Sequence, residues 1–135
     1  MIFFRIFGNI LRRVKVIKLI ICENYAEMSS IAAKIIADQI KANPNSILGL
    51  ATGSTPERMY ATLTEWHKEW GLDFSEVKTY NLDEYYPIDR ENDQSYYYFM
   101  NHHLYSKVNL KPENVNIPNG EAADFEAECA NYDKK

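Results

Sequence analysis

The stretch GLATGSTP, residues 49 to 56, decides how this chain is expected to fold. The apolar run SILGLA (46 to 51) leads into a turn of small and hydroxyl residues, and Pro56 opens a helical pattern that stops at Gly71. Proline suits the first helical position because its missing N–H needs no partner there, and glycine suits the left-handed end of a helix. The stretch therefore predicts a strand, a turn with Thr55 as N-cap, and a helix.

The same alternation of strand and helix runs along the chain. Strand-like runs occur at 14–21, 46–51, 76–82 and 113–117, and helical patterns follow Asn24, Thr55, Asp93 and Gly120. Strands alternating with helices of this length indicate βαβ units, so the predicted class is α/β, a Rossmann-like, mainly parallel sheet with helices on both faces. The last helical pattern reaches Lys135 without a glycine or proline stop, which indicates that the fold is incomplete at its C-terminus.

Each predicted helix has a side that we expect to be buried. Asn24 and Glu27 form a capping box at the start of the first helix, which ends at Asn43 and Pro44. The apolar positions at helical spacing are Met28, Ile31, Ala32, Ile35 and Ile36 in the first helix, Met59, Leu63, Trp66 and Trp70 in the second, Tyr97, Met100 and Leu104 in the third, and Phe125, Cys129 and Tyr132 in the fourth.

The composition is that of a globular domain. The chain has 135 residues, of which 46% are hydrophobic and 25% charged, enough for one domain with its own core. Its two cysteines, Cys22 and Cys129, lie far apart, so the sequence predicts neither a disulfide nor a cysteine metal site. We expect both to be buried as small hydrophobic side chains, in a reducing cytoplasm.

Charge is unevenly distributed along the chain. Residues 1–20 hold five basic and no acidic residues, and the remainder holds 10 basic and 19 acidic ones, which gives the net charge of −4. An acidic body disfavours nucleic acid as the partner, because binding a phosphate backbone needs a basic face. The apolar start, residues 1–13, is too short to span a membrane and has no cleavage site. We expect it to be an extraneous leader, with the natural start at Val14.

The turn at 52–55 is a candidate phosphate site. Backbone N–H groups at a helix N-terminus, the helix dipole and the hydroxyls of Thr52, Ser54 and Thr55 favour an anion, and Gly53 lets the backbone approach it closely. No lysine follows, so the turn is not a Walker loop and a nucleotide with magnesium is not indicated. Because any capped βα turn prefers these residues, a plain structural role stays open.

Two carboxylates, Asp83 and Glu84, directly follow a predicted strand. Adjacent residues in an extended segment point to opposite sides, so one can enter the crevice at the strand ends while the other pairs elsewhere. A carboxylate there, shielded by Tyr85 and Tyr86, could serve as a proton-transfer base. On these residues alone, an exposed acidic loop is the alternative.

Five segments together resemble the amino-terminal half of glucosamine-6-phosphate deaminases. They are LGLATGSTP, VKTYNLDEYYPI, QSYYYFMNHHLY, KPENVNIPNG and EAECANYDKK, in that family's order and spacing. The resemblance implies that residues 14–135 are the amino-terminal part of a domain that converts glucosamine 6-phosphate and water into fructose 6-phosphate and ammonia. It implies that Thr52, Gly53, Ser54 and Thr55 hold the phosphate and that Asp83 moves the C2 proton of the opened sugar to C1, with Glu84 and Tyr85 in support.

The chain also departs from that family. The family's ring-opening histidine lies in a later segment of the type DGHIAFNEP, and further basic phosphate ligands follow it; neither occurs here. His67, His102 and His103 do not match that motif, and they do not share one helix face, so they predict no metal site. A sheet without its later strands exposes a hydrophobic edge, so we expect this polypeptide alone to be inactive and poorly stable.

Other interpretations remain open at this level. A 6-phosphogluconolactonase-type hydrolase shares the fold and the loop, but such sequences tend to have Arg where this chain has Tyr85. A sugar-phosphate sensor would need a helix-turn-helix, which residues 1–13 are too short to hold. A non-catalytic sugar-phosphate-binding fragment is the third alternative. The resemblance implies a small amino-sugar phosphate as the partner, no cofactor or metal, no nucleic acid or membrane, a cytoplasmic location and, since the family is often oligomeric, a homo-oligomer.

Overall fold

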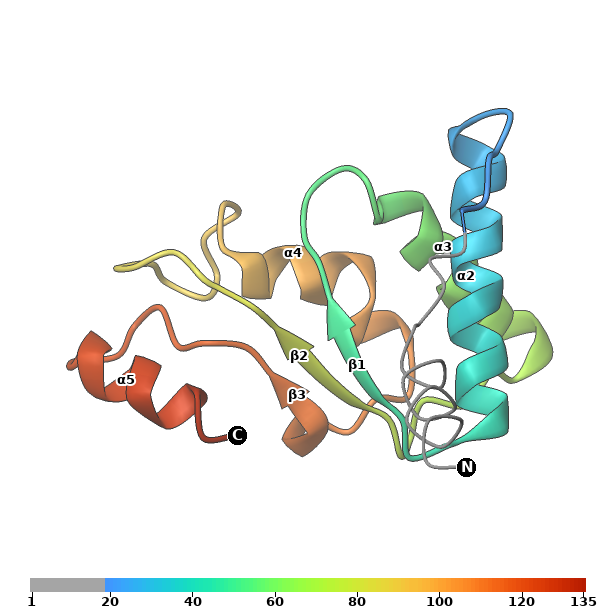
Figure 1. The fold of residues 1–135 in the computed structure, drawn as a ribbon. Helices are drawn as coiled ribbons and strands as arrows, with labels where there is room; N and C mark the ends of the chain where they lie inside the picture. The colour runs from blue at the N-terminus through green and yellow to red at the C-terminus, as the bar shows by residue number, and fades with distance from the viewer. Residues whose placement is uncertain (1–18) are drawn as a thin grey trace, which may run out of the picture.

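The computed structural model describes residues 19 to 135, which form a three-stranded parallel sheet with helices packed around it (Figure 1). The strands, in their order across the sheet, are β1 (Ile47–Leu50), β2 (Lys78–Asn81) and β3 (Val115–Asn116). Leu50 lies opposite Asn81, and Tyr80 lies opposite Asn116. The predicted α/β class with a parallel sheet is confirmed.

The strand expected at 14–21 falls mostly outside the described residues. Residues 19–22 are described and belong to no strand. Residues 14–18 and the expected leader at 1–13 lie outside the described part of the chain.

Helices connect and flank the three strands. They are α2 (Tyr25–Ala42), α3 (Glu57–Trp70), α4 (Tyr96–His103), α5 (Phe125–Tyr132) and two short 3-10 helices, η1 (Tyr105–Lys107) and η2 (Pro112–Asn114). Helices α2 and α3 pack against each other, and α5 follows β3 at the red end of the chain (Figure 1). None of the helices in residues 19 to 135 is long and apolar enough to cross a bilayer.

Helix α2 begins and ends where its capping signals predict. The Glu27 N–H donates to Asn24 Oδ1 at 3.0 Å, and the Glu27 carboxylate accepts from the Glu23 N–H at 2.7 Å. Asn43 is the C-cap, and its N–H donates to the Gln39 carbonyl. These local hydrogen bonds are set by neighbouring residues, which is why the sequence predicted them.

The buried side of α2 was predicted only in part. Met28 and Ile35 are exposed, whereas Ile36 is partly buried and packs against the core. The fully buried residues of the helix are Ser29, Ala33, Ala37 and Ile40. The Ser29 hydroxyl is satisfied because it donates to the Tyr25 carbonyl at 2.7 Å.

The core gathers side chains from α3, α4 and the segments around β2. Its largest fully buried members are Tyr60, Phe74, Leu63, Met100 and Leu104. Leu63, Met100 and Leu104 were predicted as core positions from helical spacing, and the structure confirms them.

Helix α3 begins one residue later than predicted. Thr55 is not the N-cap; Pro56 occupies that position without a side-chain hydrogen bond, and Glu57 is the first helical residue. The Tyr60 N–H donates to the Pro56 carbonyl at 2.9 Å, so the proline carbonyl starts the helical hydrogen bonds. Gly71 ends the helix with a left-handed φ of 68°, as predicted.

The predicted burial of Trp70 is wrong. Its side chain is 69% exposed and stacks on Trp66, with ring centroids 5.5 Å apart. Both tryptophans line an open groove of about 430 Å³ between α2 and α3, together with Ile40 and Leu72.

Helix α4 is capped by Ser95 and not by Asp93. The Ser95 Oγ accepts the Tyr98 N–H at 3.3 Å. The helix ends at His103 because Leu104 leaves the helical conformation, with a φ of −140°. The chain continues as η1, so the single helix expected over 94–108 is divided in two.

Helix α5 packs less closely than predicted. Phe125 is 51% exposed and Cys129 is exposed as well. Tyr132 does reach the sheet, where its hydroxyl lies 2.7 Å from the Asn81 carbonyl and 3.0 Å from the Asn116 carbonyl. The prediction that both cysteines are buried is wrong, since Cys22 is only half-buried.

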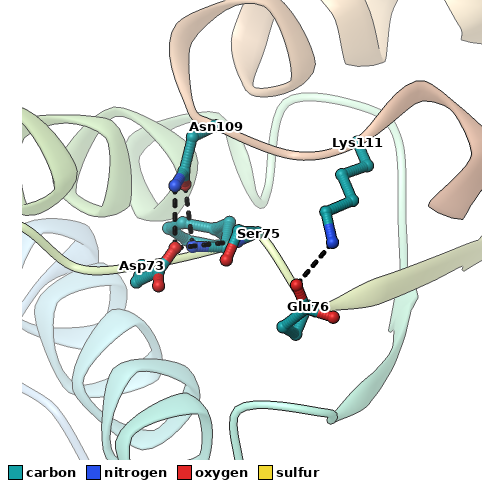
Figure 2. A network of polar contacts seen from close by, with 6 residues as sticks. Asp73, Ser75, Glu76, Asn109 and Lys111 are labelled. Carbon is teal, nitrogen blue, oxygen red and sulfur yellow. Dashed lines mark hydrogen bonds and ion pairs between the residues drawn. The ribbon is translucent and has the colours of Figure 1, made fainter.

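A polar network ties the segment after η1 to the chain just before β2 (Figure 2). The Asp73 carboxylate accepts the Ser75 N–H at 2.9 Å and the Asn109 side-chain amide at 2.7 Å. These hydrogen bonds, the one from Ser75 foremost, lower the pKa of Asp73. Lys111 forms an ion pair with Glu76 beside them. The network lies at the amino end of β2, so it supports the sheet from the end opposite to the candidate site.

Candidate functional site

The carboxyl ends of β1 and β2 bring the two predicted segments together. Leu50 and Asn81 are partners in register, so Thr52 and Asp83 each lie two residues beyond a paired position. The Asn81 side-chain amide donates to the Leu50 carbonyl at 3.0 Å, which holds the strand ends together. The turn at 52–55 and Asp83 therefore emerge at the edge of the sheet where parallel α/β proteins bind ligands.

Asn81 is the centre of a buried network below the site. Its side chain is 2% exposed, and its Oδ1 accepts the Tyr105 hydroxyl at 2.6 Å. Burial raises the pKa of Tyr105 to about 12, so this phenol stays a neutral donor. The Asn81 carbonyl accepts the Tyr132 hydroxyl. Three elements, η1, β1 and α5, are thus tied to the residue that precedes the loop of Asp83.

The turn at 52–55 is open to solvent. Gly53, Ser54 and Thr55 are exposed, and Thr52 is half-buried. Gly53 has a φ of 89°, a left-handed conformation that residues with a side chain rarely adopt. The turn leads directly into α3, so its N–H groups lie at the positive end of a helix dipole.

Two tyrosine hydroxyls from other parts of the chain hold this turn in place. The Tyr60 hydroxyl, from the first turn of α3, donates to the Ala51 carbonyl at 2.6 Å. The Tyr25 hydroxyl, from the start of α2, donates to the Ser54 carbonyl at 2.9 Å and accepts the Arg58 N–H at 3.2 Å. Both ends of the turn are therefore anchored.

Asp83 and Glu84 face different environments, as strand alternation predicted. Asp83 is exposed, whereas Glu84 is half-buried. The Glu84 carboxylate accepts four hydrogen bonds of 2.8 to 2.9 Å, and its donors are the N–H groups of Tyr85, Tyr96 and Tyr97 and the hydroxyl of Ser95. Glu84 thus fastens the loop that carries Asp83 to the N-terminus of α4.

A pair of tyrosines, Tyr85 and Tyr96, joins the loop after Asp83 to the start of α4. The Tyr96 hydroxyl donates to the Tyr85 hydroxyl at 3.2 Å, and the ring centroids are 4.8 Å apart. The pKa of Tyr96 is raised, chiefly by the hydrogen bond with Tyr85, and both Asp83 and Thr52 are close enough to act on it. Tyr96 thus links α4 to the loop of Asp83 through the hydroxyl of Tyr85.

Gly120 lies directly under the loop at 85–88. The Ile88 N–H donates to the Gly120 carbonyl at 2.9 Å. A Cβ at position 120 would lie 2.5 Å from the Ile88 side chain and 2.7 Å from the Tyr85 carbonyl. Only a glycine therefore lets the segment after β3 approach the wall of the site this closely.

In residues 19 to 135, none of the histidines forms a hydrogen bond with the turn at 52–55 or with Asp83. The His67 Nδ1 is 2.7 Å from the Leu72 carbonyl at the far end of α3, and the rings of His102 and His103 meet edge to face on α4. Within residues 19 to 135, no cluster of three or more histidine, cysteine or carboxylate side chains is arranged to hold a metal ion.

Three residues of the site, Tyr25, Tyr60 and Tyr96, were not predicted from the sequence. Tyr25 directly follows an N-cap and Tyr60 lies on the buried side of α3, and neither position signals a contact with the turn until the helices are packed. Tyr96 belongs to the run SYYYFM, of which only Tyr97 and Met100 were assigned to a buried side. Its place as the first residue of α4 was not available from the sequence, which predicted a helix directly after Asp93.

Comparison with known proteins agrees with this architecture. The family model described as glucosamine-6-phosphate isomerases/6-phosphogluconolactonase matches residues 23–135. A glucosamine-6-phosphate deaminase of Clostridium botulinum (strain Alaska E43) is 54% identical over 116 residues, which are 86% of this chain and 47% of the relative. The deaminase of Clostridioides difficile (strain 630) is 53% identical over the same length. The chain thus spans about half the length of the curated relatives it matches.

Solved structures show the same relation. A monomeric glucosamine-6-phosphate deaminase superposes with a TM-score of 0.85 at 43% identity, over 87% of this chain and 49% of that one. A 6-phosphogluconolactonase from Thermotoga maritima shares the fold, with a TM-score of 0.67 at 19% identity, over 88% of this chain and 52% of that one.

Proposed function

Because this chain belongs to the family of glucosamine-6-phosphate isomerases and 6-phosphogluconolactonases, we propose that it carries the phosphate loop and the proton-transfer base of a glucosamine-6-phosphate deaminase. The observation that carries the proposal is the register of Leu50 with Asn81, which brings the turn at 52–55 and Asp83 to one edge of the sheet.

The turn at 52–55 would hold the 6-phosphate. Its backbone N–H groups and the hydroxyls of Ser54 and Thr55 are donors, and the α3 dipole favours the negative charge. Gly53, whose φ is 89°, allows the phosphate oxygens to approach the backbone closely. Thr52 would shape the turn from its half-buried position.

Asp83 would act as the base. It takes the proton from C2 of the opened sugar and returns it to C1, through an enolamine, after which water displaces ammonia and leaves fructose 6-phosphate. Such a base must stay within hydrogen-bond reach of both carbons. The four hydrogen bonds of Glu84, together with Tyr85 and Tyr96, would supply that rigidity.

The comparisons favour the deaminase over the lactonase. Relatives named as deaminases reach 54% identity in sequence and 43% among solved structures, whereas the lactonases of Thermotoga maritima and Leishmania guyanensis are 19% and 27% identical. The proposed deamination consumes one molecule of water.

The proposed substrate also bears on where the protein acts. A phosphorylated sugar carries charge and does not cross membranes unaided, which supports a cytoplasmic location.

Binding to the chain itself tests the proposal. Residues 1–135 are titrated with glucosamine 6-phosphate, inorganic phosphate and glucosamine, and amide chemical shifts are recorded. The amide signals of Gly53, Ser54 and Thr55 should move with the two ligands that contain phosphate and should not move with glucosamine. The same chain is expected to release no measurable ammonia, because no group for ring opening is assigned to it. If glucosamine and glucosamine 6-phosphate shifted these amide signals equally, the turn at 52–55 would not be a phosphate site.

A chimera tests the base. Residues 1–135 joined to the remaining half of the C. botulinum relative should deaminate glucosamine 6-phosphate and should not hydrolyse 6-phosphogluconolactone. Asp83→Asn in the chimera should reduce kcat by at least about a hundredfold, the range of general-base catalysis, with little change in substrate affinity. An active Asp83→Asn chimera would remove this residue from the proposed mechanism.

A further inference from the structure

We propose that Tyr25 is a positioning residue for the phosphate loop, and that its hydroxyl decides which backbone N–H groups remain for the anion. The inference rests on the proposed function and adds to it a residue outside the two loops of the site. Tyr25 lies 29 residues before Ser54 in the sequence, and its hydroxyl makes two hydrogen bonds to the turn and to the start of α3.

The backbone of Tyr25 is itself firmly held. It is the first residue of α2, directly after the N-cap Asn24, whose Oδ1 accepts the Glu27 N–H. Its carbonyl accepts the buried Ser29 hydroxyl at 2.7 Å. A side chain that extends from such an anchored position can fix a flexible turn, because its own Cα has little freedom to move.

The hydroxyl acts on the turn in two ways. As a donor, it engages the Ser54 carbonyl at 2.9 Å and so fixes the peptide plane between Ser54 and Thr55. As an acceptor, it occupies the Arg58 N–H at 3.2 Å. A peptide plane that is fixed through its carbonyl also has a fixed direction for its N–H, here that of Thr55, one of the proposed phosphate donors.

The hydrogen bond from the Arg58 N–H to the Tyr25 hydroxyl limits which backbone groups can bind an anion. A helix N-terminus normally offers several free N–H groups. Here Pro56 has none, and the Arg58 N–H is already used by Tyr25. The N–H groups left for an anion are those of Gly53, Ser54 and Thr55 in the turn and those of Glu57 and Met59 at the start of α3. Tyr25 thus withdraws one helical donor, the Arg58 N–H, and leaves the donors of the turn free.

The experiment compares Tyr25→Phe with a matched control, Tyr98→Phe. The Tyr98 side chain is similarly exposed (39% against 43%) and, within residues 19 to 135, its hydroxyl makes no hydrogen bond. Dissociation constants for inorganic phosphate and for glucosamine 6-phosphate are measured on the full chain by amide chemical shifts. Hydrogen exchange of the Arg58 amide and the thermal midpoint are measured without ligand.

We expect Tyr25→Phe to weaken both ligands by the same factor, about three- to tenfold, which is the range of one net hydrogen bond. The Arg58 amide should exchange faster in Tyr25→Phe, and Tyr98→Phe should match the wild type in all measurements. A role in stability alone would lower the thermal midpoint without changing either dissociation constant, and this result would overturn the inference. So would unchanged exchange at Arg58.

The ligand series separates this inference from the function on which it rests. If the wild type binds both ligands and Tyr25→Phe binds them equally well, the inference is wrong and the proposed function stands. If the wild type binds neither ligand at millimolar concentration, the proposed function is wrong, and the inference is overturned with it.

Discussion

The Glu84 carboxylate accepts a hydrogen bond from the Ser95 hydroxyl at 2.9 Å and joins the loop after β2 to the start of α4. The N–H groups of Tyr96 and Tyr97 bind the same carboxylate at 2.8 and 2.9 Å. A negative charge at this place also interacts favourably with the dipole of α4. The neighbour of the proposed base is therefore a structural clamp, and Asp83 is left facing the open edge of the sheet.

Removal of this clamp should loosen the loop. Glu84→Ala leaves the first N–H groups of α4 without their acceptor, so we expect the free energy of unfolding to fall by about 1–3 kcal/mol. Urea denaturation measures this change, and hydrogen exchange at Tyr96 and Tyr97 should accelerate. Glu91→Ala, in the exposed loop before α4, is the control and should leave both measurements unchanged. Identical stability of the two variants would contradict the clamp.

Substitution of Asn81 should destabilise the fold, because both the N–H group and the oxygen of its side-chain amide form hydrogen bonds. Asn81→Ala leaves the Leu50 carbonyl and the Tyr105 hydroxyl without their partner, at a cost of about 2–4 kcal/mol. Asn81→Asp places a carboxylate oxygen against the Leu50 carbonyl and should be at least as destabilising at pH 7.

The pH dependence of the Asn81→Asp variant tests whether position 81 must donate a hydrogen bond to the Leu50 carbonyl. Its deficit relative to the wild type should shrink as the pH falls towards about 4, where a protonated carboxyl can donate again to the Leu50 carbonyl. Thermal unfolding over that pH range is the measurement. Asn101→Ala, an exposed asparagine on α4, should be close to neutral throughout. A pH-independent deficit in Asn81→Asp would argue against the assigned amide orientation.

Two glycines give a matched pair of substitutions. Gly120→Ala brings a Cβ within 2.5 Å of the Ile88 side chain and 2.7 Å of the Tyr85 carbonyl, so the loop at 85–88 must shift. We expect a loss of about 1–3 kcal/mol in the free energy of unfolding. Gly49→Ala, on β1, meets no atom within 4 Å and should cost little. Chemical denaturation of the two variants side by side is decisive, since a similar cost in both would contradict the close contact.

The network in Figure 2 predicts a pH dependence of stability. The folded pKa of Asp73 is lowered by the N–H of Ser75 and the amide of Asn109, so the ionised carboxylate stabilises the fold. That contribution is fully present above the unfolded pKa, about 3.9, and is lost as the pH falls through the lowered folded pKa. The difference in stability between the wild type and Asp73→Asn should stay constant from pH 7 to 5 and shrink below pH 4. An unchanged difference at pH 3 would be evidence against these hydrogen bonds. Because Asp73 is exposed, the effect should be small.

Local signals predicted much of the fold. The capping box of Asn24 and Glu27 and the left-handed stop at Gly71 depend on residues close in sequence, and both were confirmed. The predictions of helix caps and buried faces were wrong where residues far apart in the sequence interact. Ser95 and not Asp93 caps α4, and the start of that helix is also bound by Glu84 from another segment. The apolar stripe of α2 was predicted only in part, since Ile36 packs against the core but Met28 and Ile35 are exposed.

Some features of the candidate site follow from local sequence, and others depend on the tertiary structure. The sequence by itself determined the residue types that suit a sugar phosphate, namely the turn at 52–55 and Asp83 after β2, and the order of elements that makes both follow parallel strands. Only the tertiary structure decided which side chains hold them there. Tyr25 holds the turn, and Glu84 and the pair of Tyr85 with Tyr96 tie the loop of Asp83 to α4. Local sequence can specify a cap or a turn, since the interacting atoms are a few residues apart. A hydroxyl that reaches a carbonyl 29 residues away is positioned only when the helix that carries it packs against its neighbour.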